Sequence, residues 1–156
     1  MKFLVDSMLG KLARLLRIFG YDSVYAEEVE KSAPDSKLLE YAIKNDRIII
    51  TRDLPFHKKA GDQTIYLEGL DAYENLLKLE KELNLKLEFS MNKARCSMCN
   101  SFLEKIEVKS SIKNEIESDT FHNYDEFYRC TNPICNKIYW KGSHIDKIIN
   151  KLKKKA

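Results

Sequence analysis

Apolar residues follow two different spacings at the start of the chain. The run Phe3-Leu4-Val5 is continuous, which is typical of a buried strand, and the polar Asp6 ends it. After it, apolar residues recur at positions 8, 9, 12, 13, 15, 16 and 19, which is the spacing of one face of a helix. Gly20 is expected to stop this helix. The pattern therefore predicts a strand over residues 2–5 and a helix over residues 8–19.

The alternation of strand and helix continues to about residue 83. Further strands are predicted at residues 23–26, 47–51 and 64–67, and a short helical or looped piece at residues 54–60. Ser32 can cap a helix with Pro34 in its first turn, and Asp71 can open a helix that runs to residue 83. Strands that alternate with helices in this way predict an α/β fold, with a mostly parallel sheet and helices on both faces.

The pattern changes after residue 83. Residues 85–94 form a polar bridge, and short strands are predicted within residues 102–108, 126–129 and 137–140. The polar stretch 109–123 between them is expected to be a mobile loop, and a last helix is expected from Ser143 onward. We therefore expect two domains, residues 1–92 and residues 93–156.

Composition limits the class of protein. The chain has 156 residues, of which 44% are hydrophobic and 33% charged, enough for a packed core. No apolar run approaches the roughly 20 residues that a membrane helix needs. An acid already at position 6 argues against a signal peptide. We expect a cytoplasmic protein without a membrane span.

Charge is unevenly distributed between the two expected domains. Residues 1–92 hold 14 Lys and Arg against 16 Asp and Glu, whereas residues 93–156 hold 13 against 8. The second part is therefore basic, which suits a nucleic-acid partner. A solubilising end explains part of this charge equally well, because residues 151–155 alone contain four lysines.

All four cysteines lie in the second part, as Cys96 and Cys99 and then Cys130 and Cys135. Two such pairs in a small, strand-rich region are typical of a structural site in which four thiolates hold Zn²⁺. Two disulfides or redox thiols are the alternatives, and a reducing cytoplasm favours the metal. The region buries little apolar surface, so metal binding is expected to supply much of its folding free energy.

Three aspartates of the first part stand where a site in an α/β sheet is expected. Asp6 and Asp53 follow predicted strands, and Asp35 opens the helix between them. Carboxylates suit Mg²⁺ or Mn²⁺, and such an ion can activate water for attack on phosphorus. Each aspartate is also explained as a helix cap or turn residue.

Basic residues on the first predicted helix add a second candidate surface. Lys11, Arg14 and Arg17 recur at i, i+3 and i+6 and so share one face of that helix, beginning near Asp6. Such a stripe can position a phosphodiester backbone, and an ordinary solvated face explains it as well.

Five segments of the chain together resemble the Mut-seven C-terminal RNase domain family. They are residues 6–22, 38–42, Ile49-Ile50-Thr51-Arg52-Asp53, Arg95-Cys96-Ser97-Met98-Cys99-Asn100 and Tyr139-Trp140-Lys141-Gly142-Ser143-His144. The resemblance implies a PIN-like nuclease domain followed by a zinc ribbon, and metal-dependent cleavage of RNA. It matches Asp6, Asp35 and Asp53 to the acidic metal-binding positions. A fourth acid is not assigned, since Asp62 and Asp71 both qualify.

The expected function is that of a metal-dependent ribonuclease acting on single-stranded RNA. Lys11, Arg14, Arg17, Arg52 and Lys141 are the expected RNA contacts. Tyr139 and Trp140 either stack on RNA or form the small core of the ribbon. One alternative is a non-catalytic RNA-binding or ribosome-associated adaptor, and another is a protein-interaction module whose α/β half is only a scaffold.

Overall fold

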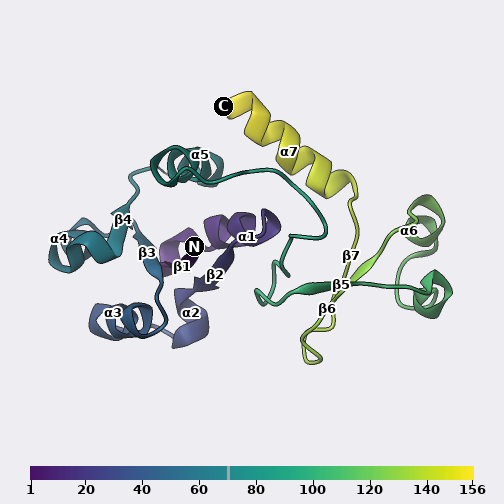
Figure 1. Ribbon diagram of the computed structural model, residues 1–156, viewed down its shortest axis with the longest axis horizontal. Helices are drawn as coiled ribbons and strands as arrows, with labels where there is room; N and C mark the ends of the chain where they lie inside the picture. Colours follow the sequence, from purple (N-terminus) through teal and green to yellow (C-terminus); the bar gives the residue numbers. More distant parts are fainter. Residues whose placement is uncertain (70) are drawn as a thin grey trace.

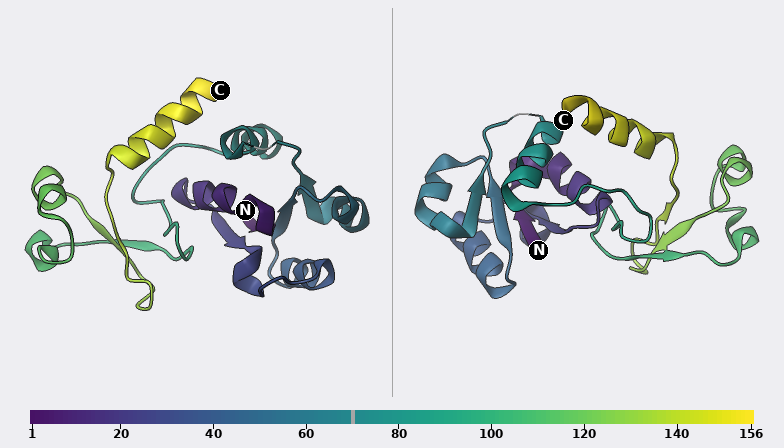
Figure 2. Two further views of the ribbon diagram at one scale, coloured as in Figure 1. Left: turned by 180° about the vertical axis from the view of Figure 1, so that it is seen from behind. Right: turned by 45° about the horizontal axis from the view of Figure 1, so that its top comes forward.

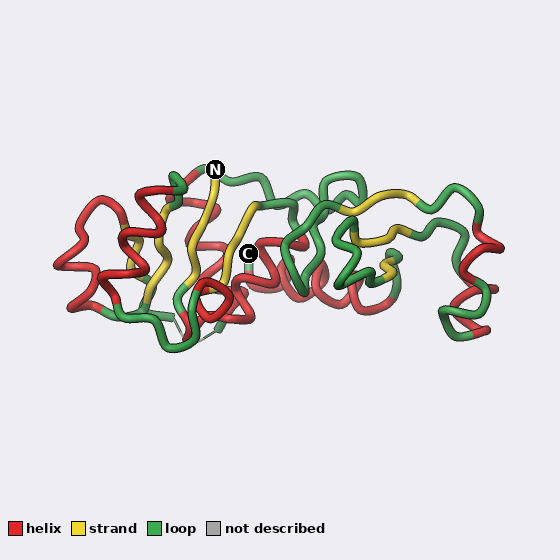
Figure 3. The backbone as a smooth tube through the Cα atoms, turned by 90° about the horizontal axis from the view of Figure 1, so that it is seen from below, coloured by secondary structure: helices red, strands yellow, loops and turns green. Residues whose placement is uncertain are grey.

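The computed structural model describes residues 1–69 and 71–156. It contains an α/β unit and a smaller antiparallel sheet, which lie side by side and are joined by an extended segment and by a long helix (Figure 1). Figure 3 shows the two groups of strands as separate sheets within an elongated molecule.

The larger sheet has four strands in the order β2-β1-β3-β4. They are β1 (Lys2–Val5), β2 (Asp22–Tyr25), β3 (Ile48–Thr51) and β4 (Thr64–Tyr66). All neighbouring pairs are parallel, as the alternating pattern predicts. In the register of β1 and β3, Val5 lies beside Ile50, so the carboxyl ends of the two central strands are level.

Helices cover both faces of this sheet because successive side chains of β1 point to opposite faces. Phe3 and Val5 belong to the core shared with α1 (Gly10–Ile18) and α5 (Ala72–Leu83). Leu4 belongs to the second core, beneath α2 (Ala26–Val29), α3 (Asp35–Lys44) and α4 (Leu54–Ala60). The predicted helices on both faces are thus confirmed, with the short α2 in addition.

The smaller sheet has the order β5-β6-β7 and is antiparallel. Its strands are β5 (Leu103–Lys105), β6 (Tyr128–Cys130) and β7 (Ile138–Tyr139). The loop expected over residues 109–123 is a wrong prediction, because this stretch contains a 3-10 helix, Lys109–Ile112, and α6, Ser118–Asn123. Ile112 is fully buried and the Lys109 ammonium lies 4.6 Å from the Phe121 ring centroid, so a few well-placed contacts order a mostly polar sequence.

The last helix, α7 (Ser143–Lys155), leaves the small sheet and returns to the α/β unit. Figure 2 shows it reaching across from the small sheet to α5. Ile148 and Leu152 are 5% and 8% exposed and belong to the same core as Phe3. The expected division at residues 92 and 93 stays a prediction, with α7 as a physical link between the two parts. Among the described residues, no helix has the length and apolar character needed to cross a bilayer.

Candidate active site and zinc centre

Asp6 and Asp53 meet at the carboxyl edge of the sheet through a shared threonine. Asp6 follows β1 and Asp53 lies two residues beyond β3. The Thr51 hydroxyl is fully buried; it donates to Asp6 Oδ2 at 2.7 Å and accepts from the Asp53 backbone N–H at 3.0 Å. The parallel register of β1 and β3 therefore brings together two acids that are 47 positions apart in the sequence.

Each of these two carboxylates also caps a helix, a role that the sequence predicted for Asp6, whereas it predicted a turn role for Asp53. Asp6 Oδ1 accepts from the Ser7 N–H at 2.7 Å, at the start of a 3-10 helix, Ser7–Leu9. Asp53 Oδ1 accepts from the Phe56 N–H at 3.0 Å, at the start of α4. A carboxylate has about four acceptor positions, so these bonds fix its orientation and leave it able to accept more. Capping and metal binding are compatible here.

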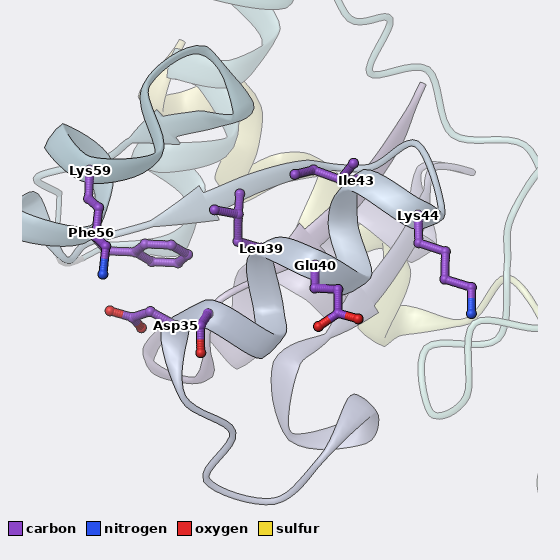
Figure 4. Close-up of a pocket in the computed structure, with 8 residues that line it drawn as sticks. Asp35, Leu39, Glu40, Ile43, Lys44, Phe56 and Lys59 are labelled. Carbon is purple, nitrogen blue, oxygen red and sulfur yellow. The ribbon is translucent and has the colours of Figure 1, made fainter.

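Asp35 is the first residue of α3 and shares the electrostatic environment of the other two acids. Its pKa is raised above the ordinary value, first by burial and then by the charges of Asp53 and Asp6, against which Lys59 acts weakly. Figure 4 shows Lys59 and Phe56 of α4 beside Asp35, at one end of a hollow of about 510 Å³. Among the described residues, the charges of Asp53 and Asp6 therefore act on Asp35 more strongly than that of Lys59 does.

The three aspartates share this edge without forming a tight ligand cluster. Within residues 1–69 and 71–156, the four cysteines are the group of three or more potential metal ligands whose donor atoms lie close together. Mg²⁺ is commonly held by one or two carboxylates, with water and substrate phosphate completing its shell. Asp6 and Asp53 offer two carboxylates at this edge of the sheet, and the charges of both act on Asp35.

Neither candidate for a fourth acid is free at this edge. Asp71 caps α5 by accepting from the Tyr73 N–H at 2.7 Å, and its carboxylate pairs with Lys155 at 2.8 Å. Asp62 lies in a 3-10 helix that precedes β4, and so at the amino end of that strand. Asp71 is therefore used as a helix cap, and Asp62 lies exposed at the opposite end of the sheet.

Among the residues expected to contact RNA, Arg17 is buried in the folded protein. It is 2% exposed, and its guanidinium donates to the carbonyls of Ser23 at 2.8 Å and Ser97 at 3.1 Å and pairs with Glu28. Its neighbours on the helical stripe, Lys11 and Arg14, are exposed. The guanidinium of Arg17 therefore joins α1 to β2 and to the first cysteine pair.

One basic residue near the acidic edge was missed from the sequence. Lys151 of α7 lies 4.8 Å from the ring centroid of Tyr73, and Lys11 of α1 lies 5.2 Å from the same centroid. Both lysines line a cavity of about 240 Å³ with Met8, which follows the Asp6 turn. The sequence predicts a helix here and leaves open whether its lysines form a solubilising end or contact nucleic acid, because it gives no sign that α7 folds back onto α5. Arg52 is half-buried beside Asp53, and Lys141 is exposed just before α7.

The four cysteines converge although 39 positions separate Cys96 from Cys135. The Sγ atoms of Cys96 and Cys135 are 3.7 Å apart, those of Cys99 and Cys130 are 3.4 Å apart, and all four lie within 4.8 Å of one another. Zn–S bonds of about 2.3 Å in a tetrahedron place sulfur atoms about 3.8 Å apart. The four cysteines can therefore hold a zinc ion.

The thiols differ strongly in acidity. Burial and the neighbouring sulfurs raise the pKa of Cys130 to about 12. Burial acts in the same direction on Cys99, but its hydrogen bonds with Ser101, Cys130 and Cys96 together outweigh it and lower the pKa of Cys99 to about 6. Crowded thiols resist joint deprotonation, and a bound cation supplies the charge that permits it. The Tyr139 hydroxyl lies 2.9 Å from Cys96 Sγ, so this aromatic ring is part of the support of the cysteine cluster.

The geometry so far defines an α/β protein with an acidic sheet edge and a small sheet built around four cysteines. Residues 1–152 match the family model described as Mut7-C RNAse domain. Because this match covers nearly the whole chain, the protein belongs to that family, and the resemblance found in the sequence is confirmed. Comparison with curated proteins and with solved structures gives no match. The family points to a nuclease role that involves RNA.

Proposed function

We propose that the protein is a metal-dependent ribonuclease whose reaction takes place at the carboxyl edge of the large sheet. The observation that carries the proposal is the Thr51 hydroxyl, which bonds both to the Asp6 carboxylate and to the Asp53 backbone. A buried bridging hydroxyl holds the two acids in a fixed relation, which a site that orients reactants requires.

The residues at this edge fit a hard divalent cation such as Mg²⁺ or Mn²⁺. The donors are carboxylate oxygens, and the raised pKa of Asp35 reflects, after burial, the charges of Asp53 and Asp6. When bound, such a cation lowers the pKa of a water molecule and offsets charge on the phosphoryl group. In this proposal Asp6 and Asp53 hold the cation, and Asp35 binds it as well or orients the attacking water.

The basic residues next to this edge position the RNA backbone in our proposal. Lys11 and Arg14 of α1 are exposed, and Arg52 stands beside Asp53. Lysine and arginine side chains fix the register of a nucleic acid mainly through its phosphates. Lys151 extends this set because it shares the Tyr73 ring with Lys11.

The small sheet is a zinc ribbon in this proposal, and it helps to hold single-stranded RNA. Four thiolates without an open coordination position make a structural site, so the zinc ion stabilises the ribbon and takes no part in cleavage. Lys141, exposed between β7 and α7, contacts the phosphates of the same strand.

The test is cleavage of a mixed pool of single-stranded RNA with added Mn²⁺. Asp6→Asn keeps an acceptor for the Ser7 cap but loses the charge, so we expect cleavage to fall on the order of 100-fold or more. Asp62→Asn, at the other end of the sheet, is the matched control and retains cleavage. Full activity of a rigorously purified Asp6→Asn protein contradicts the assignment. RNA binding without cleavage by the wild type favours the adaptor.

A further inference from the structure

A third cavity, of about 380 Å³, lies where the small sheet, the segment before it and the start of α7 meet. Its volume falls in the range of pockets that hold small organic ligands, about 300–1,000 Å³. Four aromatic side chains line it, namely Phe89, Tyr124, Tyr139 and Trp140. It is separate from the acidic edge, since none of the three aspartates lines it.

Trp140 provides a fixed aromatic surface in this cavity. Its ring lies 6.0 Å from that of Phe127 and 6.4 Å from that of Tyr124, measured between centroids. A Cβ atom at Gly142 would come within 2.7 Å of the indole Nε1, so glycine at this position allows α7 to begin close against the indole. A ring held in this way can stack on a ligand without losing much conformational freedom.

The charged residues that line the cavity have one sign. They are Arg95 and Lys137, and among the described residues that line it none is acidic; His144 lines it as well. The Lys137 ammonium lies 5.2 Å from the Tyr139 ring centroid, and His144 stands exposed in the first turn of α7. An anionic ligand with a flat apolar part is the complement of these aromatic and cationic groups.

We propose that this cavity binds one unpaired nucleotide of the RNA, with its base against Trp140 and Tyr124 and its phosphate toward Lys137 and Arg95. The identity of the ligand rests on the proposed function; the cavity itself does not. From the cavity, α7 runs back to the α/β unit, where Lys151 and Lys11 lie against the Tyr73 ring and line a cavity with Met8, two residues after Asp6. A strand anchored at the cavity can follow this basic helix toward the acids.

The chain contains a single tryptophan, so its fluorescence reports directly on the cavity. The protein to use is the full-length Asp53→Asn variant loaded with zinc, which in the proposed function binds RNA without cleaving it. Adding short single-stranded RNA is expected to quench Trp140. Heparin, a polyanion without bases, is expected to compete for the surface without quenching. Equal quenching by heparin overturns the proposal, and so does tighter binding of a free mononucleotide than of RNA.

Two variants test which groups hold the base and the phosphate. Tyr124→Leu is expected to weaken RNA affinity about tenfold, because one stacking contact is lost. Tyr41→Leu removes a half-buried tyrosine from α3 and is the matched control, with unchanged affinity. Lys137→Ala, at an exposed position, is expected to reduce the slope of log affinity against log salt by about one. The Lys137→Ala variant therefore still tests the cavity if the Tyr124→Leu protein does not fold.

The outcome for the cavity is separable from the outcome for cleavage. If labelled RNA binds, as measured by anisotropy, while Trp140 fluorescence and the affinity of both cavity variants stay unchanged, the cavity proposal is wrong and the ribonuclease proposal stands. If RNA quenches Trp140 but the wild type cleaves no RNA with Mn²⁺, the nuclease proposal fails and the cavity remains an RNA site.

Discussion

At the scale of single residues, the surroundings of Asp35 oppose its charge, whereas those of Arg17 stabilise its charge. Asp35 faces the field of two other acids and has a raised pKa, first through burial. Arg17 is buried but surrounded by acceptors from three separate segments. The charge of Asp35 destabilises the folded state at a place where a cation is expected to bind. The charge of Arg17 stabilises the contact between three segments.

Asp35→Asn should stabilise the protein in the absence of divalent cations and impair cleavage. A pKa above the ordinary value of 3.8 means that the folded state prefers the protonated form, so the charged form costs stability at neutral pH. The burial that raises this pKa is only partial and the residue is exposed, so the gain is small, on the order of 1 °C in Tm. Thermal unfolding against pH measures it.

The difference between the variant and the wild type should shrink as the pH falls through the raised pKa, because the wild-type carboxylate then becomes neutral as well. Asp62→Asn is the control at an exposed site away from the other acids, and its Tm should follow that of the wild type. A lower Tm for Asp35→Asn at neutral pH contradicts this account.

Arg17→Met should lower the free energy of unfolding by about 2 kcal/mol, since one buried and one partly buried carbonyl lose their donor while the apolar part of the side chain is kept. Arg14→Met, at an exposed position of the same helix, should change it by less than about 0.5 kcal/mol. Urea denaturation followed by circular dichroism compares the two. Equal stability of the two variants argues against the internal role of Arg17.

Arg17 also marks what local pattern cannot reveal. The spacing of Lys11, Arg14 and Arg17 predicts one face of a helix, but two of the acceptors that bury Arg17 are Ser97, from the segment of the first cysteine pair, and Glu28. In contrast, the capping roles of Asp6 and Asp53 were predictable, because the N–H groups that they accept from are within three residues.

At the scale of elements, α7 belongs to the α/β unit by its packing although it follows the ribbon in the chain. Its apolar positions 145, 148, 149 and 152 predicted a helix with one buried face. The identity of the covering element was not predictable, since apolar periodicity specifies a face and no partner. The strand β1 could be predicted because this requires no knowledge of its partners. An uninterrupted apolar run indicates a strand buried on both faces, whichever elements cover it.

Ile148→Ala should destabilise the α/β unit by about 2–4 kcal/mol, because it leaves a cavity in the core that contains Phe3. The matched control is Ile134→Ala, the same substitution at a side chain that is 95% exposed, with an expected change near zero. Chemical denaturation gives both values. If Ile148→Ala is as harmless as the control, α7 does not contribute to that core in solution.

At the scale of the whole molecule, the first cysteine pair is bonded to the edge of the large sheet. Asn100, next to Cys99, accepts from the Ser23 N–H of β2 at 3.0 Å and donates to Asp22 at 2.7 Å. These bonds satisfy polar groups on an edge strand that would otherwise face solvent. The cysteine spacing predicted the cluster, but nothing in that spacing indicated this attachment.

Removing zinc with a strong chelator should therefore unfold residues 95–142 and also lower the Tm of the α/β unit. The first effect follows from the small apolar core of the ribbon, and the second from the loss of the Asn100 bonds to β2. Amide NMR spectra resolve the two parts. Added Zn²⁺ should restore both, whereas Mg²⁺ should restore neither. A well-dispersed ribbon spectrum after complete metal removal contradicts this prediction.

The return of α7 to α5 has a consequence for synthesis. A ribosome makes the strand that contains Phe3 early and α7 after every other described element, so the apolar face that Ile148 and Leu152 cover stays open while the rest is made. Until α7 emerges, Lys11 also lacks Lys151 as its neighbour on Tyr73. A half-made chain thus contains all three aspartates before Lys151 stands beside Lys11 on this ring.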